Sequence, residues 1–248
     1  MQKNNFISSS DNTYLKLIRK LSNKKNRYKE KKFVIESRKM LEEAIENNQD
    51  IDFILLSDKL ENVDEIFNDN SNIKIVKDEL FKSVSTLTSP DGYLACLNFT
   101  NIDKPLSNKV LVLDHLQDPG NLGTLIRSAE AFGFNDIYLY ECVDIYNEKV
   151  LRSTMGSVFR LNIKSVKRDD IDKLRKSHVF YTADMGGQDF RKVDFAENIA
   201  LVIGNEANGL SPEFRTKENK IIAIPMMGKV ESLNAAISGT LIMAQTIK

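Results

Sequence analysis

The second half of the chain alternates regularly between short apolar runs and amphipathic segments. Short apolar runs predict β-strands at residues 110–113, 136–140, 159–163, 179–183, 199–203 and 221–224. Helical spacing of apolar residues predicts helices at 121–132, 147–155, 169–176 and 232–247. Strands joined through helices run parallel and are buried on both faces, so the sequence predicts an α/β fold built on a parallel sheet.

The N-terminal part predicts a smaller α/β unit. Its expected helices are residues 14–21, 37–47 and 81–85, and its expected strands are 33–35, 51–57, 73–76 and 93–99. Residues 100–108, TNIDKPLSN, are polar and contain Pro105, which is typical of a linker. We therefore predict two domains, residues 1–103 and residues 104–248.

The charge of the chain is unevenly distributed although its formal net charge is +0. Lys and Arg far outnumber Asp and Glu in residues 1–40, and the reverse holds in residues 41–80. A basic segment interleaved with Tyr14, Tyr28 and Phe33 indicates a surface that faces nucleic-acid phosphates. The alternative is a solvated helix and linker, because most charged residues only face water. The basic side chains in question are Arg19, Lys20, Lys24, Lys25 and Arg27.

Several classes of protein are disfavoured by composition. The 248 residues are 42% hydrophobic and 28% charged, which is ordinary for a globular protein, and no apolar stretch is long enough to span a membrane. The opening residues have no apolar core of the kind a signal peptide needs. Cys96 and Cys142 form no CxxC pattern, and two histidines supply a metal site poorly. We expect a cytoplasmic protein with reduced thiols and no metal.

Three segments of the second half share one property: each follows a predicted strand and is rich in Gly, Asn and small polar residues. They read LVLDHLQDPGNLGTLIRSAEAFG at residues 111–133, IALVIGNEANGLSPEF at 199–214 and IPMMGKVESLNAAIS at 224–238. Ligands of open parallel sheets bind beyond the carboxyl ends of the strands, so we expect the three loops to converge on one site. The first segment matches neither of the glycine patterns of dinucleotide-binding and P-loop folds.

Each segment also has a purely structural interpretation. Arg127 could pair with Glu130 on the same helix. Glu206 could be an ordinary acid of a surface loop, although loops often carry function. Ser232 could simply cap an apolar, buried core helix, in which case Asn234 near its start would be buried and would need hydrogen-bond partners.

Taken together, the segments resemble the SpoU (TrmH-like) branch of the SPOUT RNA methyltransferases. The motifs are DPGNLGTLIRSAEAFG, LVIGNEANGLSPE and IPMMGKVESLNAAIS, in the family's order, and KVLRSTMGSVFRLNI between them is also similar. The N-terminal half resembles the ribosomal-protein-like RNA-binding domain often fused to this catalytic domain, chiefly in FKSVSTLTSPDGYLACL. One departure is Ala235-Ala236-Ile237, where Val-Ser-Val is typical of the family, and it should alter packing more than chemistry.

The resemblance implies a deep trefoil knot in the C-terminal domain, S-adenosylmethionine bound in that knot, and a homodimer whose active sites draw on both chains. It implies transfer of a methyl group to a ribose 2′-hydroxyl of structured RNA, with 23S ribosomal RNA favoured because a separate RNA-binding domain suits a large RNA. No metal is required. The implied RNA-binding residues are Arg19, Lys20, Lys24, Lys25, Arg27 and Arg152.

Residue roles follow from the same resemblance. Arg127 would act as an unusual base or stabilise the developing alkoxide; we favour stabilisation because arginine stays charged. Asn121 would orient Arg127 or the nucleotide, Glu206 would fix Asn121, Arg127 or the closing loop, and Ser232 and Asn234 would orient those side chains. The implied cofactor contacts are mostly backbone, at Gly204, Ile224, Leu233, Thr182, Ala183, Asp184, Met226 and Asn234.

Other functions stay open at this point. A transfer-RNA 2′-O-methyltransferase is one alternative, and a non-catalytic RNA-binding relative is another, although Asn121, Arg127, Glu206 and Asn234 are all present. A Rossmann-type methyltransferase or dehydrogenase would need a Gly-rich turn directly after the first strand, where HLQDPGN stands instead. A base-modifying SPOUT enzyme is disfavoured by the NEANGLSPE and SLNAA motifs.

Overall fold

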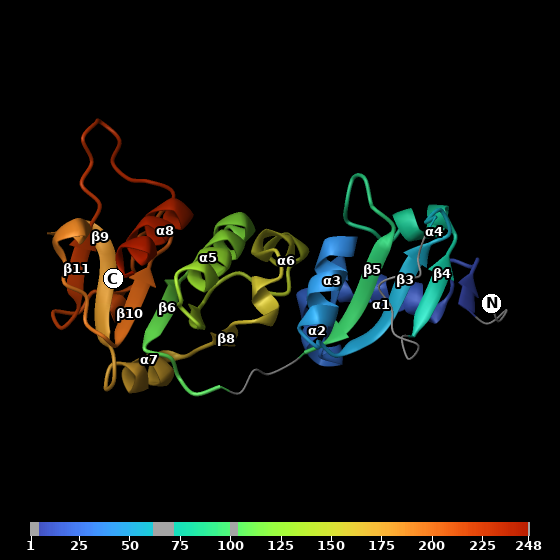
Figure 1. Ribbon diagram of the computed structural model, residues 1–248, viewed down its shortest axis with the longest axis horizontal. Coiled ribbons are helices and arrows are strands. Elements are labelled where there is room, and N and C mark those ends of the chain that lie inside the picture. Colours follow the sequence, from blue (N-terminus) through green and yellow to red (C-terminus); the bar gives the residue numbers. More distant parts are fainter. Residues whose placement is uncertain (1–4, 62–71, 100–103, 248) are drawn as a thin grey trace. The chain divides into compact units, whose positions relative to one another are not determined.

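The computed structural model describes residues 5–61, 72–99 and 104–247 (Figure 1). Its contacts divide the chain into two compact units, residues 1–101 with 146–159 and residues 102–145 with 160–248. The division predicted from the sequence assigns residues 146–159 to the second domain, whereas their contacts in the structure are with the first unit. Residues 100–103 of the predicted linker lie outside the described residues.

The first unit contains a five-stranded sheet of order β1-β4-β3-β5-β2. Strand β5 runs antiparallel to both of its neighbours, and the other pairs are parallel. The strands are β1 (Phe6–Ile7), β2 (Lys32–Glu36), β3 (Ile51–Ser57), β4 (Ile73–Val76) and β5 (Tyr93–Asn98). The helices are α1 (Thr13–Leu21), α2 (Lys24–Glu30), α3 (Arg38–Glu46), α4 (Asp78–Lys82) and α6 (Glu148–Thr154), followed by the 3₁₀ turn η2 (Ser157–Phe159).

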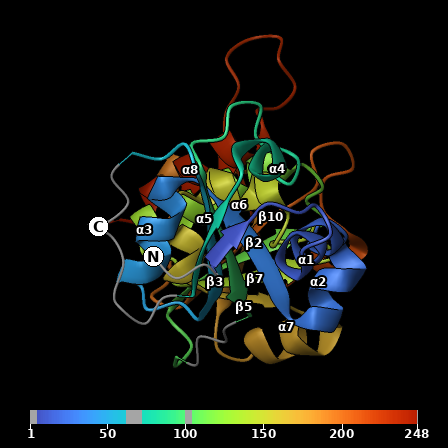
Figure 2. The same ribbon diagram turned by 90° about the vertical axis from the view of Figure 1, so that its right-hand side faces the viewer.

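Helices cover both faces of this sheet, with α1 and α3 on opposite sides of it in Figure 2. Side chains alternate along a strand, so β3 sends Phe53 and Leu55 into the core under α1 and α4. The intervening Ile54 and Leu56 join a second core under α3. That second core also contains Leu151 and Phe159. Residues 146–159 are therefore held in the first unit by buried apolar contacts.

The second unit is built on a six-stranded sheet of order β11-β9-β10-β6-β7-β8, in which every pair is parallel. Its strands are β6 (Lys109–Asp114), β7 (Asp136–Tyr140), β8 (Asn162–Ser165), β9 (Val179–Asp189), β10 (Ile199–Ile203) and β11 (Lys220–Ala223). Its helical segments are α5 (Pro119–Ala131), α7 (Arg168–Leu174), η3 (Phe190–Lys192), η4 (Pro212–Phe214) and α8 (Ala235–Gln245). The predicted α/β fold with a parallel sheet is confirmed.

Helices α5 and α8 pack against each other on one face of this sheet. The two helices approach each other closely at Gly239 of α8. A Cβ added there would lie 2.4 Å from a methyl carbon of Leu125 on α5 and 3.2 Å from Ile203 on β10. Helix α7 contributes Ile171 and Leu174 to a core that also contains side chains of β6, β9 and β10. No helix in the described part of the chain is both long enough and apolar enough to cross a lipid bilayer.

Some element boundaries differ from the sequence prediction for identifiable reasons. The strand expected at residues 159–163 begins at Asn162, because residues 157–159 form a 3₁₀ turn whose Phe159 enters the core of the first unit. Helix α2 was not predicted, since KKNRYKE has no apolar periodicity; it is capped by Asn23, whose side chain accepts from the Lys25 N–H. The helix expected from Ser232 begins at Ala235.

Candidate active site

The three motif loops leave the carboxyl ends of β6, β10 and β11. Strands β6 and β10 are neighbours, and Leu113 pairs with Ile203 at their ends, so the loops that follow start side by side. Strand β11 lies across β9 from β10, and the loop of residues 224–234 leads from it to α8 (Figure 1). This is the sheet edge where open parallel sheets bind ligands.

Helix α5 begins in a way that presents Asn121. Asp118 is the N-cap, and its carboxylate accepts from the Asn121 N–H at 2.7 Å. Pro119 occupies the first turn, where its missing N–H has no cost. The amide of Asn121 therefore projects from the first turn of a firmly capped helix, toward the loops after β10 and β11.

Three of the predicted catalytic side chains form one hydrogen-bonded row. The Asn121 Nδ2 donates to Glu206 Oε1 at 2.8 Å, and the Asn234 Nδ2 donates to Asn121 Oδ1 at 2.9 Å. The row joins residues that are 85 and 113 positions apart in the sequence. Each of the three motif loops contributes one member, so the expected convergence of the loops is observed.

Asn234, and not Ser232, caps helix α8. Its Oδ1 accepts from the N–H groups of Ala236 and Ile237 at 2.9 and 3.3 Å. We expected Ser232 to be the cap and Asn234 to be buried; both expectations were wrong, because both residues are exposed and the helix starts three residues after Ser232. Ser232 makes no hydrogen bond with any residue that the structure describes. Its catalytic role stays a prediction.

Glu206 sits at the tip of a tight loop that requires glycine at its base. The backbones of Asn205 and Gly209 exchange two hydrogen bonds of 2.9 and 3.0 Å. Gly204 packs against this ring so closely that an added Cβ would lie 2.7 Å from the carbonyl carbon and oxygen of Gly209. No other residue fits at Gly204 without moving the loop that carries Glu206.

Two residues that the sequence analysis did not single out tie this loop to β6. Asp114 is fully buried, and its Oδ2 accepts from the Ser211 N–H at 2.6 Å. Asn205 donates from Nδ2 to the carbonyl of His115 at 2.8 Å. An acidic residue closing the apolar run VLVL was the available signal for Asp114, because a carboxylate is buried only when it is paired or hydrogen-bonded.

Arg127 stands apart from the hydrogen-bonded row. It is exposed on α5 and makes no hydrogen bond or ion pair with any described residue. The alternative pairing with Glu130 is not formed, since Glu130 pairs with Arg160 instead. Asn121 and Arg127 are six residues apart, which places them about 120° apart around the helix. Within one chain the structure does not bring Arg127 to Asn121.

The predicted cofactor-binding residues lie at the same sheet edge. Thr182 on β9 pairs with Val202, close to the end of β10, and with Ile221 on β11. Ala183 and Asp184 begin a segment of β9 that does not pair with β11. Ile221 of β11 pairs with Thr182, and the next residue of β11, Ile222, pairs with Gln188. The remaining members of the predicted set follow β10 or β11 in the chain; they are Gly204, Ile224, Met226, Leu233 and Asn234.

The loop of residues 224–233 leaves its main-chain polar groups available. None of these residues takes part in a backbone–backbone or side-chain hydrogen bond with a described residue. Main-chain donors and acceptors need partners when they are covered, so this loop can bind a ligand through its backbone. Apolar side chains accompany them: Met226 and Leu233 are each 36% exposed, and Met227 is fully exposed.

The described residues contain neither a cluster of metal ligands nor a thiol with a lowered pKa. No group of three or more His, Cys, Asp or Glu side chains in residues 5–61, 72–99 and 104–247 is arranged to hold a metal ion. Burial raises the pKa of the Cys96 and Cys142 thiols to about 12. Both cysteines are free. Thiols with such pKa values are poor nucleophiles at neutral pH.

The predicted RNA-binding residues belong to the first unit. Arg19, Lys20, Lys24 and Lys25 are exposed on α1 and α2, and Lys20 pairs with Glu30 at 2.5 Å. Arg152 on α6 donates to Thr86 Oγ1 at 3.2 Å. Arg27 differs from the others because it is 5% exposed and donates to the carbonyls of Leu21 and Ser22, both at 2.8 Å. It holds the turn between α1 and α2, and its contact with RNA stays a prediction.

Comparison with known families identifies the class of protein. Residues 108–244 match the SpoU rRNA methylase family, and residues 12–95 match the MRM3-like substrate-binding domain. The chain therefore belongs to the SpoU rRNA methylase family, and the family predicted from the motifs is confirmed.

Particular relatives extend along almost the whole chain. It is 30% identical over 243 residues to the 23S rRNA (guanosine(2553)-2′-O)-methyltransferase RlmP of Bacillus subtilis, covering 96% of this chain and 97% of that protein. It is similar to the AdoMet-bound rRNA methyltransferase from Sinorhizobium meliloti, with a TM-score of 0.86 and 26% identity over 97% of this chain and 96% of the other. The SpoU methyltransferase AviRb from Streptomyces viridochromogenes gives a TM-score of 0.83 and 25% identity over 94% and 96%.

Proposed function

We propose that this chain transfers a methyl group from S-adenosylmethionine to a ribose 2′-hydroxyl of ribosomal RNA. The observation that carries the proposal is the row formed by Glu206, Asn121 and Asn234, in which three distant family motifs meet at the ligand-binding edge of the sheet. Family membership, the name of the B. subtilis relative and the cofactor bound to the S. meliloti relative support the same reaction.

The residues at this edge fit the cofactor. The loop of residues 224–233 offers free main-chain donors and acceptors, which suit an adenine ring and an amino-acid group, and its apolar side chains suit the rest of the ligand. Gly204 allows close approach to the backbone. We assign the cofactor to Gly204, Ile224, Met226 and Leu233, with Thr182, Ala183, Asp184 and Asn234 beside it.

The reaction forms a bond between the 2′-oxygen and the methyl carbon, leaves the carbon–sulfur electron pair on sulfur and releases the hydroxyl proton to solvent water. When bound, S-adenosylmethionine supplies an electrophilic methyl group. Arg127 stabilises the negative charge that develops on the 2′-oxygen, since a guanidinium stays charged and only donates. Asn121 is held by Glu206 and Asn234 and orients the nucleotide. Ser232 lies in the loop of residues 224–233 that precedes α8.

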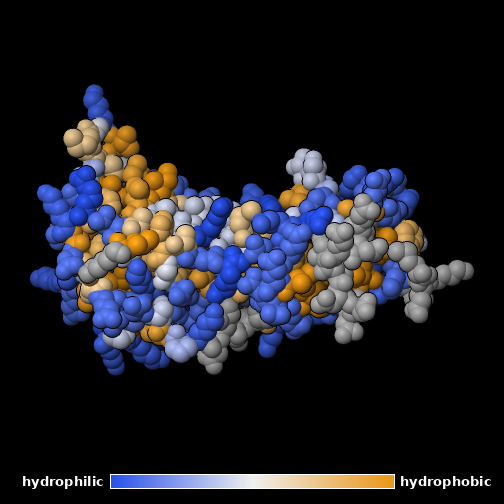
Figure 3. Space-filling view, in the orientation of Figure 1, coloured by the Kyte–Doolittle hydropathy of each residue, from blue (hydrophilic) through white to orange (hydrophobic). Residues whose placement is uncertain are grey.

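We propose that the working form is a homodimer. Helix α8 leaves Ile237 and Leu241, four residues apart on one face, 52% and 42% exposed. Apolar surface gathers over α8 and the loop before it in Figure 3, and Val230 and Met227 of that loop are also exposed. A second copy that covers this face would bury it and bring an Arg127 to the site that lacks one within a single chain.

Three further assignments belong to the same proposal. The C-terminal domain, residues 104–248, carries the trefoil knot of its family, and residues 1–103 select the RNA. The protein acts in the cytoplasm, where ribosomal RNA is found. Mass-spectrometric mapping of 2′-O-methyl nucleotides in RNA from cells with and without the gene tests the function. We expect one ribosomal site to lose its methyl group; an unchanged ribosomal RNA with a changed transfer RNA would overturn the choice of substrate.

A further inference from the structure

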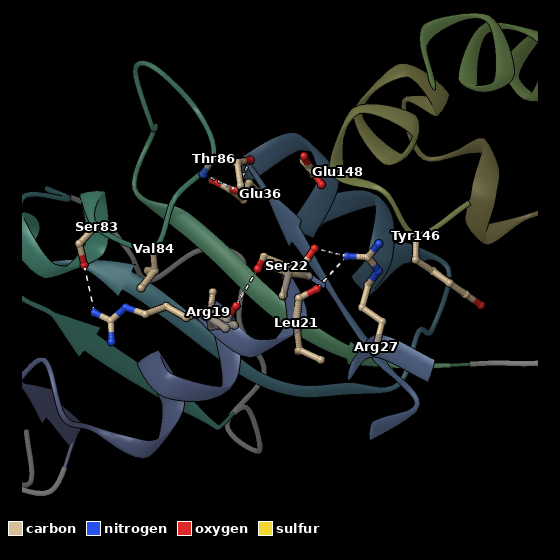
Figure 4. A pocket seen from close by; sticks show the side chains of 12 residues that line it. Arg19, Leu21, Ser22, Arg27, Glu36, Ser83, Val84, Thr86, Tyr146 and Glu148 are labelled. Atoms are coloured by element: carbon tan, nitrogen blue, oxygen red, sulfur yellow. Dashed lines mark hydrogen bonds between the residues drawn. The ribbon is translucent and has the colours of Figure 1, made fainter. Parts of the chain in front are cut away.

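The first unit contains a cavity of about 210 Å³ that the proposed catalytic chemistry does not use (Figure 4). It lies among α1, α2, β2, the segment before β5 and the start of α6. Its floor is apolar, formed by Ile18, Leu21, Val34 and Val84, and its remaining lining is polar. The polar lining residues are Arg19, Ser22, Arg27, Glu36, Ser83, Thr86, Tyr146 and Glu148.

Most charged groups of this cavity are already bonded to the protein. Arg19 donates to the Ser10 carbonyl at 2.9 Å and to Ser83 Oγ at 3.3 Å. Glu36 is 6% exposed, and its carboxylate accepts from the Ser85 hydroxyl and from the N–H and hydroxyl of Thr86. Buried Arg27 holds the opposite wall. The walls are therefore fixed before any ligand enters.

Glu148 is the exception. It is half-buried at the first position of α6, and its carboxylate has no hydrogen-bond or ion-pair partner among the described residues. It lines this cavity and also an adjoining smaller one, which Arg152 lines as well. Figure 4 shows Glu148 and Tyr146 at one end of the cavity and Arg19 with Ser83 at the other. A carboxylate in this position is an unused acceptor inside a preformed pocket.

We propose that this cavity receives an unpaired guanine nucleotide of the RNA substrate, with Glu148 accepting the base N–H groups. A carboxylate only accepts, so it selects a base edge with two adjacent donors. Guanine presents N1–H and N2–H side by side, whereas adenine, cytosine and uracil place an acceptor beside each donor. The inference rests on the proposed function, because the RNA must reach the first unit.

The surroundings suit a single nucleotide of a larger RNA. The apolar lining residues can cover the face of a base that enters the cavity. Arg19 lines the cavity, Arg152 lines the adjoining smaller one, and exposed Lys24 and Lys25 belong to α2, so the phosphates of an RNA that enters here meet positive charge. Sequence-specific proteins commonly read unpaired RNA bases in this manner.

Binding of short oligonucleotides to the full chain tests the proposal. The probes are fluorescently labelled oligouridines that carry guanosine, inosine or adenosine at one central position, and the readout is fluorescence anisotropy. We expect guanosine to bind about tenfold more tightly than adenosine, with inosine, which lacks the N2 amino group, in between. Glu148→Gln should remove the preference, because an amide offers one acceptor and a competing donor. Glu46→Gln, an exposed residue of α3 outside the cavity, is the control with the same change of charge and should keep it.

Equal affinity of the unsubstituted chain for guanosine and adenosine would overturn the proposal, and so would a guanosine preference that survives in Glu148→Gln. The inosine comparison needs no variant, so it decides the question even if Glu148→Gln fails to fold. Methyl transfer is measured separately on ribosomal RNA. A guanosine preference without methyl transfer would contradict the proposed function alone, and methyl transfer without a preference would contradict this inference alone.

Discussion

The side-chain amide of Asn234 donates to the Oδ1 of Asn121 at 2.9 Å, and the direction of this bond is fixed from both ends. The Asn234 oxygen already accepts from two backbone N–H groups of α8, so only its NH₂ group can face Asn121. At the other end, Asn121 uses its own NH₂ group on the Glu206 carboxylate, which can only accept. The cap of α8, the amide of Asn121 and the carboxylate of Glu206 therefore form one chain of hydrogen bonds with a fixed direction.

This arrangement predicts that capping and activity can be separated at Asn234. Asn234→Ala should lower the free energy of unfolding by about 1 kcal/mol through loss of the cap. Asn234→Ser should restore most of that stability, because serine caps well, while activity stays low because no NH₂ group reaches Asn121. Chemical denaturation and methyl-transfer rates provide the two measurements. Full activity in Asn234→Ser would show that the bond to Asn121 has no role.

A second prediction concerns Arg127. Arg127→Ala should reduce methyl transfer to RNA at least about 100-fold, the usual effect of removing a group that stabilises an oxyanion. Its binding of S-adenosylmethionine should change little, since within one chain Arg127 makes no hydrogen bond or ion pair with the loops assigned to the cofactor. Calorimetry measures the binding and a tritium-transfer assay measures the rate. A fully active Arg127→Ala would remove Arg127 from the mechanism.

Gly204→Ala tests the loop that carries Glu206. The new Cβ would lie 2.7 Å from the backbone of Gly209, so the loop must shift, at a cost on the order of 1–3 kcal/mol. We expect lower thermal stability together with weaker cofactor binding. Gly228→Ala is the control for stability, because an added Cβ there meets nothing within 4 Å. Equal melting temperatures for the two variants would contradict the packing described at Gly204.

Residues 146–159 provide a prediction about the stability of the first unit. Leu151 is 2% exposed in the same core as α3 and β5 of the first unit. Leu151→Ala should therefore cost about 2–5 kcal/mol, and the loss should fall on the first unit even though residue 151 lies in the segment matched by the methylase family. Hydrogen exchange resolved by peptide locates the effect. Lys149→Ala on the exposed side of α6 should leave exchange unchanged; equal exchange in both variants would refute this packing.

The two thiols predict a pH dependence. Because burial raises the pKa of Cys96 and Cys142 from 9.0 to about 12, both should resist a disulfide reagent at pH 8 in the folded protein and react once it is unfolded. Between pH 9 and 12 the unfolded chain loses these protons first, so the free energy of unfolding should fall as pH rises through this range. Rapid labelling of buried Cys96 or half-buried Cys142 at pH 8 in the native state would contradict their raised pKa values.

The sequence was sufficient for the alternation of strands and helices and for the meeting of Asn121, Glu206 and Asn234, because motif loops after parallel strands share one edge. It was not sufficient where tertiary contacts decide the outcome. Phe159 was placed in a strand by its apolar neighbours, yet it turns into the core of the first unit. Ser232 and Asn234 are both good caps by residue type, and local periodicity cannot tell which of them the chain uses.

The chemical position of the added methyl group separates methylation of a ribose from methylation of a base. The full chain is incubated with tritiated S-adenosylmethionine and ribosomal RNA from cells that lack the gene, and the labelled RNA is digested to nucleosides. We expect label in one 2′-O-methylated nucleoside, and at least about 100-fold less incorporation with Arg127→Ala. Label on a base, or no label with the unsubstituted chain, would contradict the proposed function.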